Sequence, residues 1–178
     1  EDLFAPVFTS SRRRAVWLGI NLITAFIASF VIGIFDEVVA EVVALAVLMP
    51  IVASMGGITG SQTLTLTIRG LATGQLAMSN LRALGNKEVL VAFSNGLLWA
   101  LVVSAFTSIW FDNNWLSMII AFALIINMLI AAISGIFIPV LLDRVGIDPA
   151  LAGSVILTTV TDVVGFFVFL GSASLLLV

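Results

Sequence analysis

The sequence contains no cysteine and no histidine. Without cysteine the chain can form no disulfide or thiolate, and without histidine it has neither imidazole acid–base chemistry nor the common zinc sites. Charge is also scarce, because only 10% of the 178 residues are Asp, Glu, Lys or Arg, against about 25% in soluble domains. Most of the side chains that usually act as nucleophiles, acids and bases in catalysis are therefore missing or scarce. We expect that the chain is not an enzyme.

What the sequence does contain is apolar surface: 61% of residues are hydrophobic and the mean hydropathy is +1.26. Its uncharged stretches reach the roughly 20 residues that a helix needs to cross about 30 Å of hydrocarbon. They are apolar on all sides, which favours helices over the alternating strands of a barrel. The sequence predicts an all-α integral membrane protein, one domain over residues 1–178 in the lipid bilayer, with spans at about 15–35, 42–68, 89–111, 114–142 and 150–177.

Five crossings place every basic residue on the same side of the membrane. The positive-inside rule makes that side the cytoplasm, so we expect the N-terminus inside and the C-terminal residue, Val178, outside. The polar segment 70–88 is then expected to be a cytoplasmic loop, in which a surface helix can form. The basic residues are Arg12, Arg13, Arg14, Arg69, Arg82, Lys87 and Arg144, whereas the opposite side holds Asp36, Glu37, Glu41 and Asp112.

Asp162 is out of place in lipid. It lies about 13 residues after Pro149, hence roughly 20 Å along a helix, where a carboxylate costs about 2.5 to 3.5 kcal/mol. Its helical neighbours at i−4, i−3 and i+3 are Thr158, Thr159 and Gly165, a polar and small-sided stripe. One interpretation is that Asp162 is protonated or hydrogen-bonded and only holds the bundle together. No basic residue lies within a span, however, so cation binding is the natural compensation.

The second span carries a glycine-rich segment. Gly56, Gly57 and Gly60 precede Gln62 and a ladder of threonines, and glycines weaken a helix interior. Close helix packing through small residues is one explanation. A pore lining is the other, because Gly57 and Gly60 fall on one face and leave room for a hydrated ion.

Asp148 precedes Pro149, which is typical of a helix start with an N-cap. It also lies 14 residues before Asp162, within about 40° of the same helix face, so a cytoplasmic-mouth carboxylate that attracts cations is its second possible role. Among the lone amides, Asn95 is expected to form an interhelical hydrogen bond, whereas Asn127 either kinks the fourth span or lines the same cavity.

Taken together, these features resemble the transmembrane domain of the MgtE family of magnesium channels and transporters, over nearly the whole chain. The resemblance is carried by Arg12-Arg13-Arg14 with Trp17 and Asn21, Pro50 with Met55-Gly56-Gly57 and Gly60-Ser61-Gln62, Arg69-Gly70-Leu71-Ala72, Asp148-Pro149-Ala150, and Thr158-Thr159-Val160-Thr161-Asp162 with Gly165. The family usually has Asn directly after its Gly-Gly pair, and this chain departs from it with Ile58.

The resemblance implies a homodimer whose second and fifth spans line a pore on the two-fold axis. In it, Asp162 would hold a largely hydrated Mg²⁺, the transported and bound ion, with Gly57, Gly60, Gly165, Thr158 and Thr159 along its path. It further implies a multi-pass protein of a bacterial or archaeal inner membrane, with cytosolic regulatory domains ahead of the first span and no nucleic-acid partner. Glu1 and Asp2 would be the trailing end of that regulatory region.

Magnesium chemistry agrees with such a pore. Mg²⁺ dehydrates reluctantly, so a site that keeps its waters and offers one or two carboxylates is expected. Two facing Asp162 side chains repel each other unless a cation lies between them, and conduction should therefore weaken at acidic pH. A channel or facilitator for divalent cations is the leading hypothesis, and a secondary transporter coupled to protons or sodium is the alternative.

Overall fold

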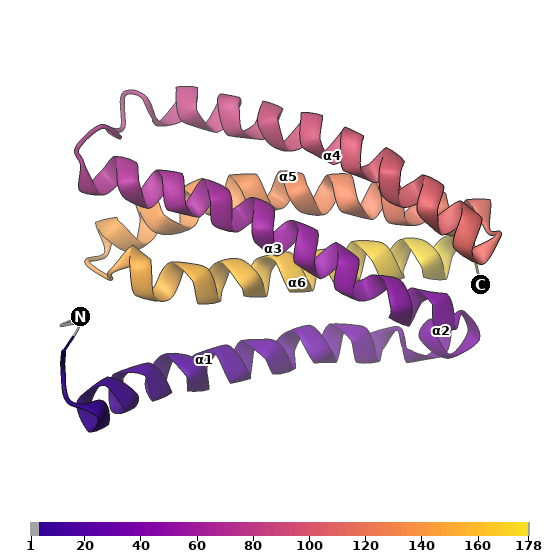
Figure 1. The fold of residues 1–178 in the computed structure, drawn as a ribbon, viewed down its shortest axis with the longest axis horizontal. Helices are drawn as coiled ribbons and strands as arrows, with labels where there is room; N and C mark the ends of the chain where they lie inside the picture. Colours follow the sequence, from indigo (N-terminus) through magenta and orange to yellow (C-terminus); the bar gives the residue numbers. More distant parts are fainter. Residues whose placement is uncertain (1–3, 178) are drawn as a thin grey trace.

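The computed structural model describes residues 4–177, so the expectations for Glu1, Asp2 and Val178 lie outside the described residues. Within that range the chain is helical and contains no strand. The helices, drawn in Figure 1, are α1 (Val7–Ile34), α2 (Asp36–Glu41), α3 (Val43–Ala72), α4 (Leu81–Phe111), α5 (Asn114–Arg144) and α6 (Pro149–Leu176).

The five long helices are membrane spans by length and composition. Each has 28 to 31 residues, and its most apolar window has a mean hydropathy between 1.9 and 2.7. At a rise of 1.5 Å per residue, such helices extend about 42 to 46 Å, enough for the hydrocarbon core and both interfaces. The predicted all-α fold with five spans is confirmed. The short helix α2 lies in the turn between the first two spans.

The structure differs from the sequence prediction between the second and third spans. α3 continues to Ala72 and α4 already begins at Leu81, so the expected loop 70–88 shortens to residues 73–80. The reason is that residues 81–88 are mostly good helix formers, and charges are tolerated where a helix emerges from the bilayer. Asn80 orders the short loop, because its side chain accepts a hydrogen bond from the amide of Ala77 and donates one to the carbonyl of Gln75, both 2.8 Å.

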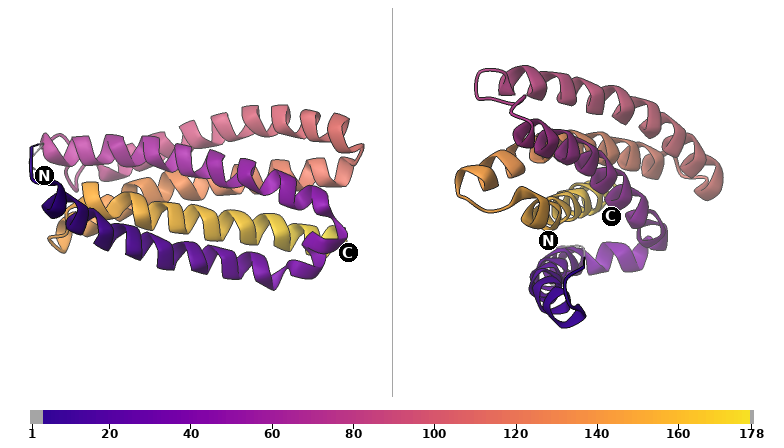
Figure 2. Two further views of the ribbon diagram at one scale, coloured as in Figure 1. Left: turned by 60° about the horizontal axis from the view of Figure 1, so that its bottom comes forward. Right: turned by 60° about the vertical axis from the view of Figure 1, so that its left-hand side comes forward.

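α5 is the centre of the bundle. It packs against α3, α4 and α6, whereas α1 packs chiefly against α6 and α4 has few contacts with α3. Figures 1 and 2 show α1 and α4 on opposite sides of this central group in every view. α1 is correspondingly the most exposed span, with 11% of its apolar window buried against 56% for α5.

The basic residues are confined to one end of the bundle, whereas acidic residues lie at both ends. α1, α4 and α6 begin, and α3 and α5 end, at the end where the N-terminus lies (Figure 1). All seven basic residues therefore lie in or near that end. The opposite end carries the acidic residues of α2 together with Asp112, the left-handed residue that ends α4.

Candidate cation-binding site

Asp162 lies near the middle of α6 and is half-buried. Among residues 4–177, no side chain donates a hydrogen bond to its carboxylate and no basic group pairs with it. The basic residues lie in or near the end of the bundle where α6 begins, whereas Asp162 lies 13 residues after Pro149, the first residue of α6. The carboxylate is therefore unpaired near the middle of a candidate membrane span.

The threonines before Asp162 bond to their own helix. The Thr158 hydroxyl donates to the carbonyls of Ser154 and Val155, at 2.9 and 3.0 Å, and the Thr159 hydroxyl donates to Val155 at 2.8 Å. Because each hydroxyl proton is used within the helix, the lone pairs of the oxygen remain as acceptors. Thr158 is exposed and Thr159 is half-buried. Both can therefore offer oxygen to a hydrated cation.

The glycines of α3 have different surroundings. A methyl group at Gly57 would meet no atom within 4 Å, so this position opens onto the surface of the chain. A methyl group at Gly60 would lie 2.7 Å from the Leu157 side chain. Gly60 is thus buried at the crossing of α3 with α6, where the small residue lets the two helices approach.

Gly165 is also a packing position in this chain. It is buried, and a methyl group there would lie 2.7 Å from the side-chain nitrogen of Asn127. Gly56 faces the same amide even more closely. Asn127 donates a 3.0 Å hydrogen bond to the carbonyl of Val52, while its own oxygen is buried without a partner among the described residues. Asn127 therefore fills a slot that two glycines leave at the junction of α3, α5 and α6.

These contacts fix the relative depth of the predicted site residues. α3 and α6 run in opposite directions (Figure 1). Gly60 lies against Leu157, and Val52 lies near Gly165. Asp162 is accordingly at the depth of the Gly56-Gly57 pair.

Asp148 takes the capping role that its position before a proline predicts. Its carboxylate accepts a hydrogen bond from the amide of Ala150 at 2.9 Å, and Pro149 occupies the first turn of α6. The side chain is exposed at the N-terminal end of the bundle. Asp148 and Asp162 are separated by about 21 Å along the helix, so the structure does not bring them together in one site.

Glu88 is the ionisable residue that sequence reasoning missed. It was assigned to a loop, but it lies on α4 with 5% of its surface exposed. The Thr63 hydroxyl of α3 lies 3.2 Å from its carboxylate. A signal was present in the sequence: Glu88, Ala92 and Asn95 recur at helical spacing and continue the periodicity of the third span.

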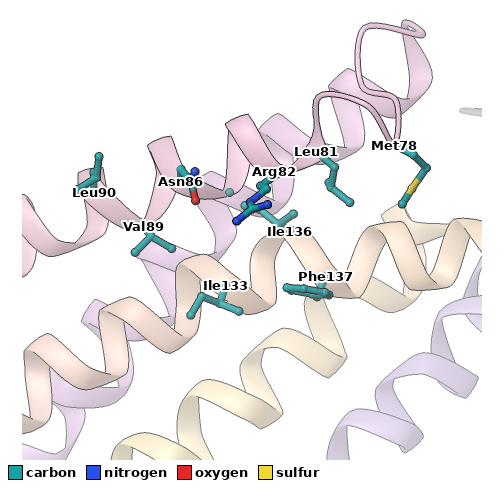
Figure 3. Close-up of a pocket in the computed structure, with 10 residues that line it drawn as sticks. Met78, Leu81, Arg82, Asn86, Val89, Leu90, Ile133, Ile136 and Phe137 are labelled. Carbon is teal, nitrogen blue, oxygen red and sulfur yellow. The ribbon is translucent and has the colours of Figure 1, made fainter.

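One cavity among the described residues is not suited to a cation. It has a volume of about 790 Å³ and lies between the first turns of α4 and the second half of α5. Its lining is mainly apolar, from residues such as Leu81, Ile133 and Phe137 (Figure 3). Arg82 is its charged group, and its guanidinium would repel a positive ion.

Fold and site together define a class: a multi-pass helical membrane protein with an unpaired carboxylate near the middle of one span. A family model supplies the particular assignment. The model named MgtE, described as a divalent cation transporter, matches residues 49–172. The chain belongs to the MgtE family, which confirms the resemblance noted in the sequence and argues against an enzyme.

Individual relatives agree. The chain is 33% identical to the magnesium transporter MgtE of Thermus thermophilus over 165 residues, 92% of this chain and 36% of the relative. It is 30% identical to the magnesium transporter MgtE of Bacillus subtilis over 167 residues, 94% of this chain and 37% of the relative. The chain thus spans well under half the length of these relatives.

Proposed function

We propose that this chain forms the membrane pathway of a channel or facilitator for divalent cations, with Mg²⁺ as the main substrate. The observation that carries the proposal is the carboxylate of Asp162, which lies at mid-membrane depth with no hydrogen-bond donor or basic partner among residues 4–177. An unpaired ionised carboxylate at that depth is costly. A cation offsets that cost, and the relatives named as magnesium transporters supply the choice of ion.

A largely hydrated ion suits the chemistry of these helices. The described residues contain no group of three or more Asp, Glu, His or Cys side chains that would hold a metal directly. Mg²⁺ typically keeps several waters and uses one or two carboxylates. Asp162 with the acceptor oxygens of Thr158 and Thr159 fits such a hydrated ion, and the open position Gly57 leaves room for it.

A homodimer would complete the pathway. One chain contributes one carboxylate, so two copies related by a two-fold axis between α3 and α6 would supply the pair that a divalent ion favours. The open position Gly57 and the exposed Thr158 would then face the axis, whereas Gly60 and Gly165 would support the path by letting α3, α5 and α6 pack closely.

The decisive experiment is Mg²⁺ flux into liposomes that contain the purified chain. We expect Asp162→Asn and Asp162→Ala to abolish flux, because both remove the charge. Asp36→Asn, which changes an exposed acid at the other end of the bundle, is the matched control and should conduct normally. Normal flux in both Asp162 variants would refute the assignment.

The alternative is a secondary transporter coupled to protons or sodium, since one titratable carboxylate inside the membrane suits proton exchange as well. Single-molecule electrical recording separates the two mechanisms. Unitary currents far above transporter turnover support the channel. Flux that requires an opposing proton or sodium gradient supports coupled transport.

We also assign the basic end of the bundle to the cytoplasm, following the positive-inside rule. The natural chain has no cysteine, so each introduced cysteine is a unique reporter. Ser79→Cys, in the 73–80 loop, should resist a membrane-impermeant thiol reagent added outside cells. Glu37→Cys, at the other end, should react. The reverse pattern would overturn the orientation.

A further inference from the structure

Glu88 has acceptor capacity that the described residues do not fill. A carboxylate offers about four lone-pair sites, and Thr63 is its single hydrogen-bond donor among residues 4–177, at 3.2 Å. The ammonium of Lys87 is 3.8 Å away on a side chain that is 69% exposed. That distance is well beyond the roughly 2.7 to 2.9 Å of a charge-assisted hydrogen bond. Glu88 is therefore buried without a strong partner.

The carboxylate lines a polar cavity of about 220 Å³ between α3 and α4. This is the liquid volume of about seven water molecules at about 30 Å³ each. Part of the lining is apolar and includes Met55 of α3 and Met128 of α5. The lining also includes Trp99, whose indole N–H is a donor, and the oxygen-bearing side chains of Thr59, Gln62, Thr63, Glu88 and Asn95.

The hydroxyl groups of this lining are arranged as acceptors. Thr59 donates to the carbonyl of Met55 at 2.8 Å, and Thr63 donates toward Thr59 or Glu88. Their lone pairs therefore remain available, beside the amide oxygens of Gln62 and Asn95. Such a set of oxygens around one carboxylate matches the preference of a hard divalent cation that keeps most of its water.

The cavity is separate from the Asp162 site. Its described lining comes from α3, α4 and α5, with no residue from α6. Asp162 lies on α6, which packs against α1, α3 and α5 and is not a main neighbour of α4. A ligand in the cavity would consequently not share a coordination shell with one at Asp162.

We propose that Glu88 and the surrounding side-chain oxygens form a second binding site, for a hydrated divalent cation, in the cavity between α3 and α4. The choice of ion class rests on the proposed function, whereas the existence of the site rests on the burial of Glu88 and on its oxygen-rich lining. A cation there would neutralise a buried carboxylate that Lys87 reaches only loosely.

Methionine methyl groups provide a local test. Of the five methionines, Met55 and Met128 line the cavity, whereas Met118 is exposed near the start of α5 at the opposite end of the bundle. In protein labelled with ¹³C-methyl methionine and carrying Asp162→Asn, Mn²⁺ should broaden the Met55 and Met128 signals at concentrations that leave Met118 sharp. Excess Mg²⁺ should restore them.

Glu88→Gln is the test variant, because it keeps the shape and the acceptor for Thr63 but removes the charge. We expect the Mn²⁺ midpoint for Met55 and Met128 to rise at least tenfold. Glu37→Gln, an exposed acid of α2, is the matched control and should leave the midpoint unchanged. If Glu88→Gln does not fold, as judged from its metal-free spectrum, Asn95→Leu should show the same direction of change.

An unchanged midpoint in a folded Glu88→Gln protein, or uniform broadening of every methionine, would overturn the second site. The result is independent of the proposed function, because the binding assay is carried out without the Asp162 carboxylate. Normal Mg²⁺ flux in Asp162→Asn would refute the proposed function and leave the Glu88 measurement intact.

Discussion

Gly165 of α6 and Asn127 of α5 fit so closely that a methyl group on the glycine would lie 2.7 Å from the amide nitrogen of the asparagine. The same amide donates to the carbonyl of Val52 on α3. One buried side chain therefore ties three helices together one turn beyond Asp162. The depth and orientation of the carboxylate depend on this junction.

We expect Gly165→Ala to destabilise the protein by about 1 to 3 kcal/mol, the usual cost of overpacking a filled site. The added methyl group must displace Asn127 or push α6 away from α5. Thermal unfolding in detergent should show a lower midpoint, and Mg²⁺ flux should fall with it.

Gly19→Ala is the matched control for this prediction, because a methyl group there meets no atom within 4 Å. Alanine is the better helix former, so the midpoint should stay the same or rise. Equal stability of Gly165→Ala and Gly19→Ala would show that the Asn127 slot is looser than the packing indicates.

Asp148 provides a second prediction, based on its cap. Asp148→Ala removes the 2.9 Å hydrogen bond to the amide of Ala150 and should cost about 0.5 to 2 kcal/mol. Asp148→Ser removes the charge but keeps a capping oxygen, so its unfolding midpoint should remain close to wild type. An equal loss of stability in both variants would mean that the carboxylate charge, and not the cap, stabilises α6.

The spans, and the presence of one acid inside the last of them, are readable from the sequence because both depend on local composition. The roles of Gly60 and Gly165 were not readable. Whether a glycine lines an ion path or lets another helix pack closely depends on the residue that faces it. Leu157 faces Gly60, and Asn127 faces Gly165. Glu88 is missed because glycine and polar residues such as Gly85 and Asn86 precede it and favour a loop, although helix α4 turns Glu88 inward toward Thr63.

The third prediction concerns pH. Protonation of Asp162 removes the charge that holds the cation, so protons and Mg²⁺ compete for the site. Mg²⁺ flux should fall at acidic pH, and a higher Mg²⁺ concentration should move the fall to lower pH, as reciprocal linkage requires. Stopped-flow fluorescence in liposomes, with the internal pH clamped, measures both effects. A pH profile that does not move with Mg²⁺ concentration would assign the fall to another group.

The fourth prediction uses the position at which this chain departs from its family. Ile58 is 59% exposed and lines the cavity that contains Glu88, so it does not belong to the packed core. Ile58→Asn, which introduces the usual family residue, would add an amide oxygen to that cavity at little cost in packing.

Because the added oxygen faces the Glu88 cavity, Ile58→Asn should tighten Mn²⁺ binding there, measured by the Met55 and Met128 signals in the Asp162→Asn background. Ile58→Leu preserves an apolar side chain of the same volume and is the matched control. If Ile58→Asn instead changed cation selectivity at Asp162 and left the Glu88 cavity unaffected, residue 58 would act on the α6 pathway. The two sites would then not be independent.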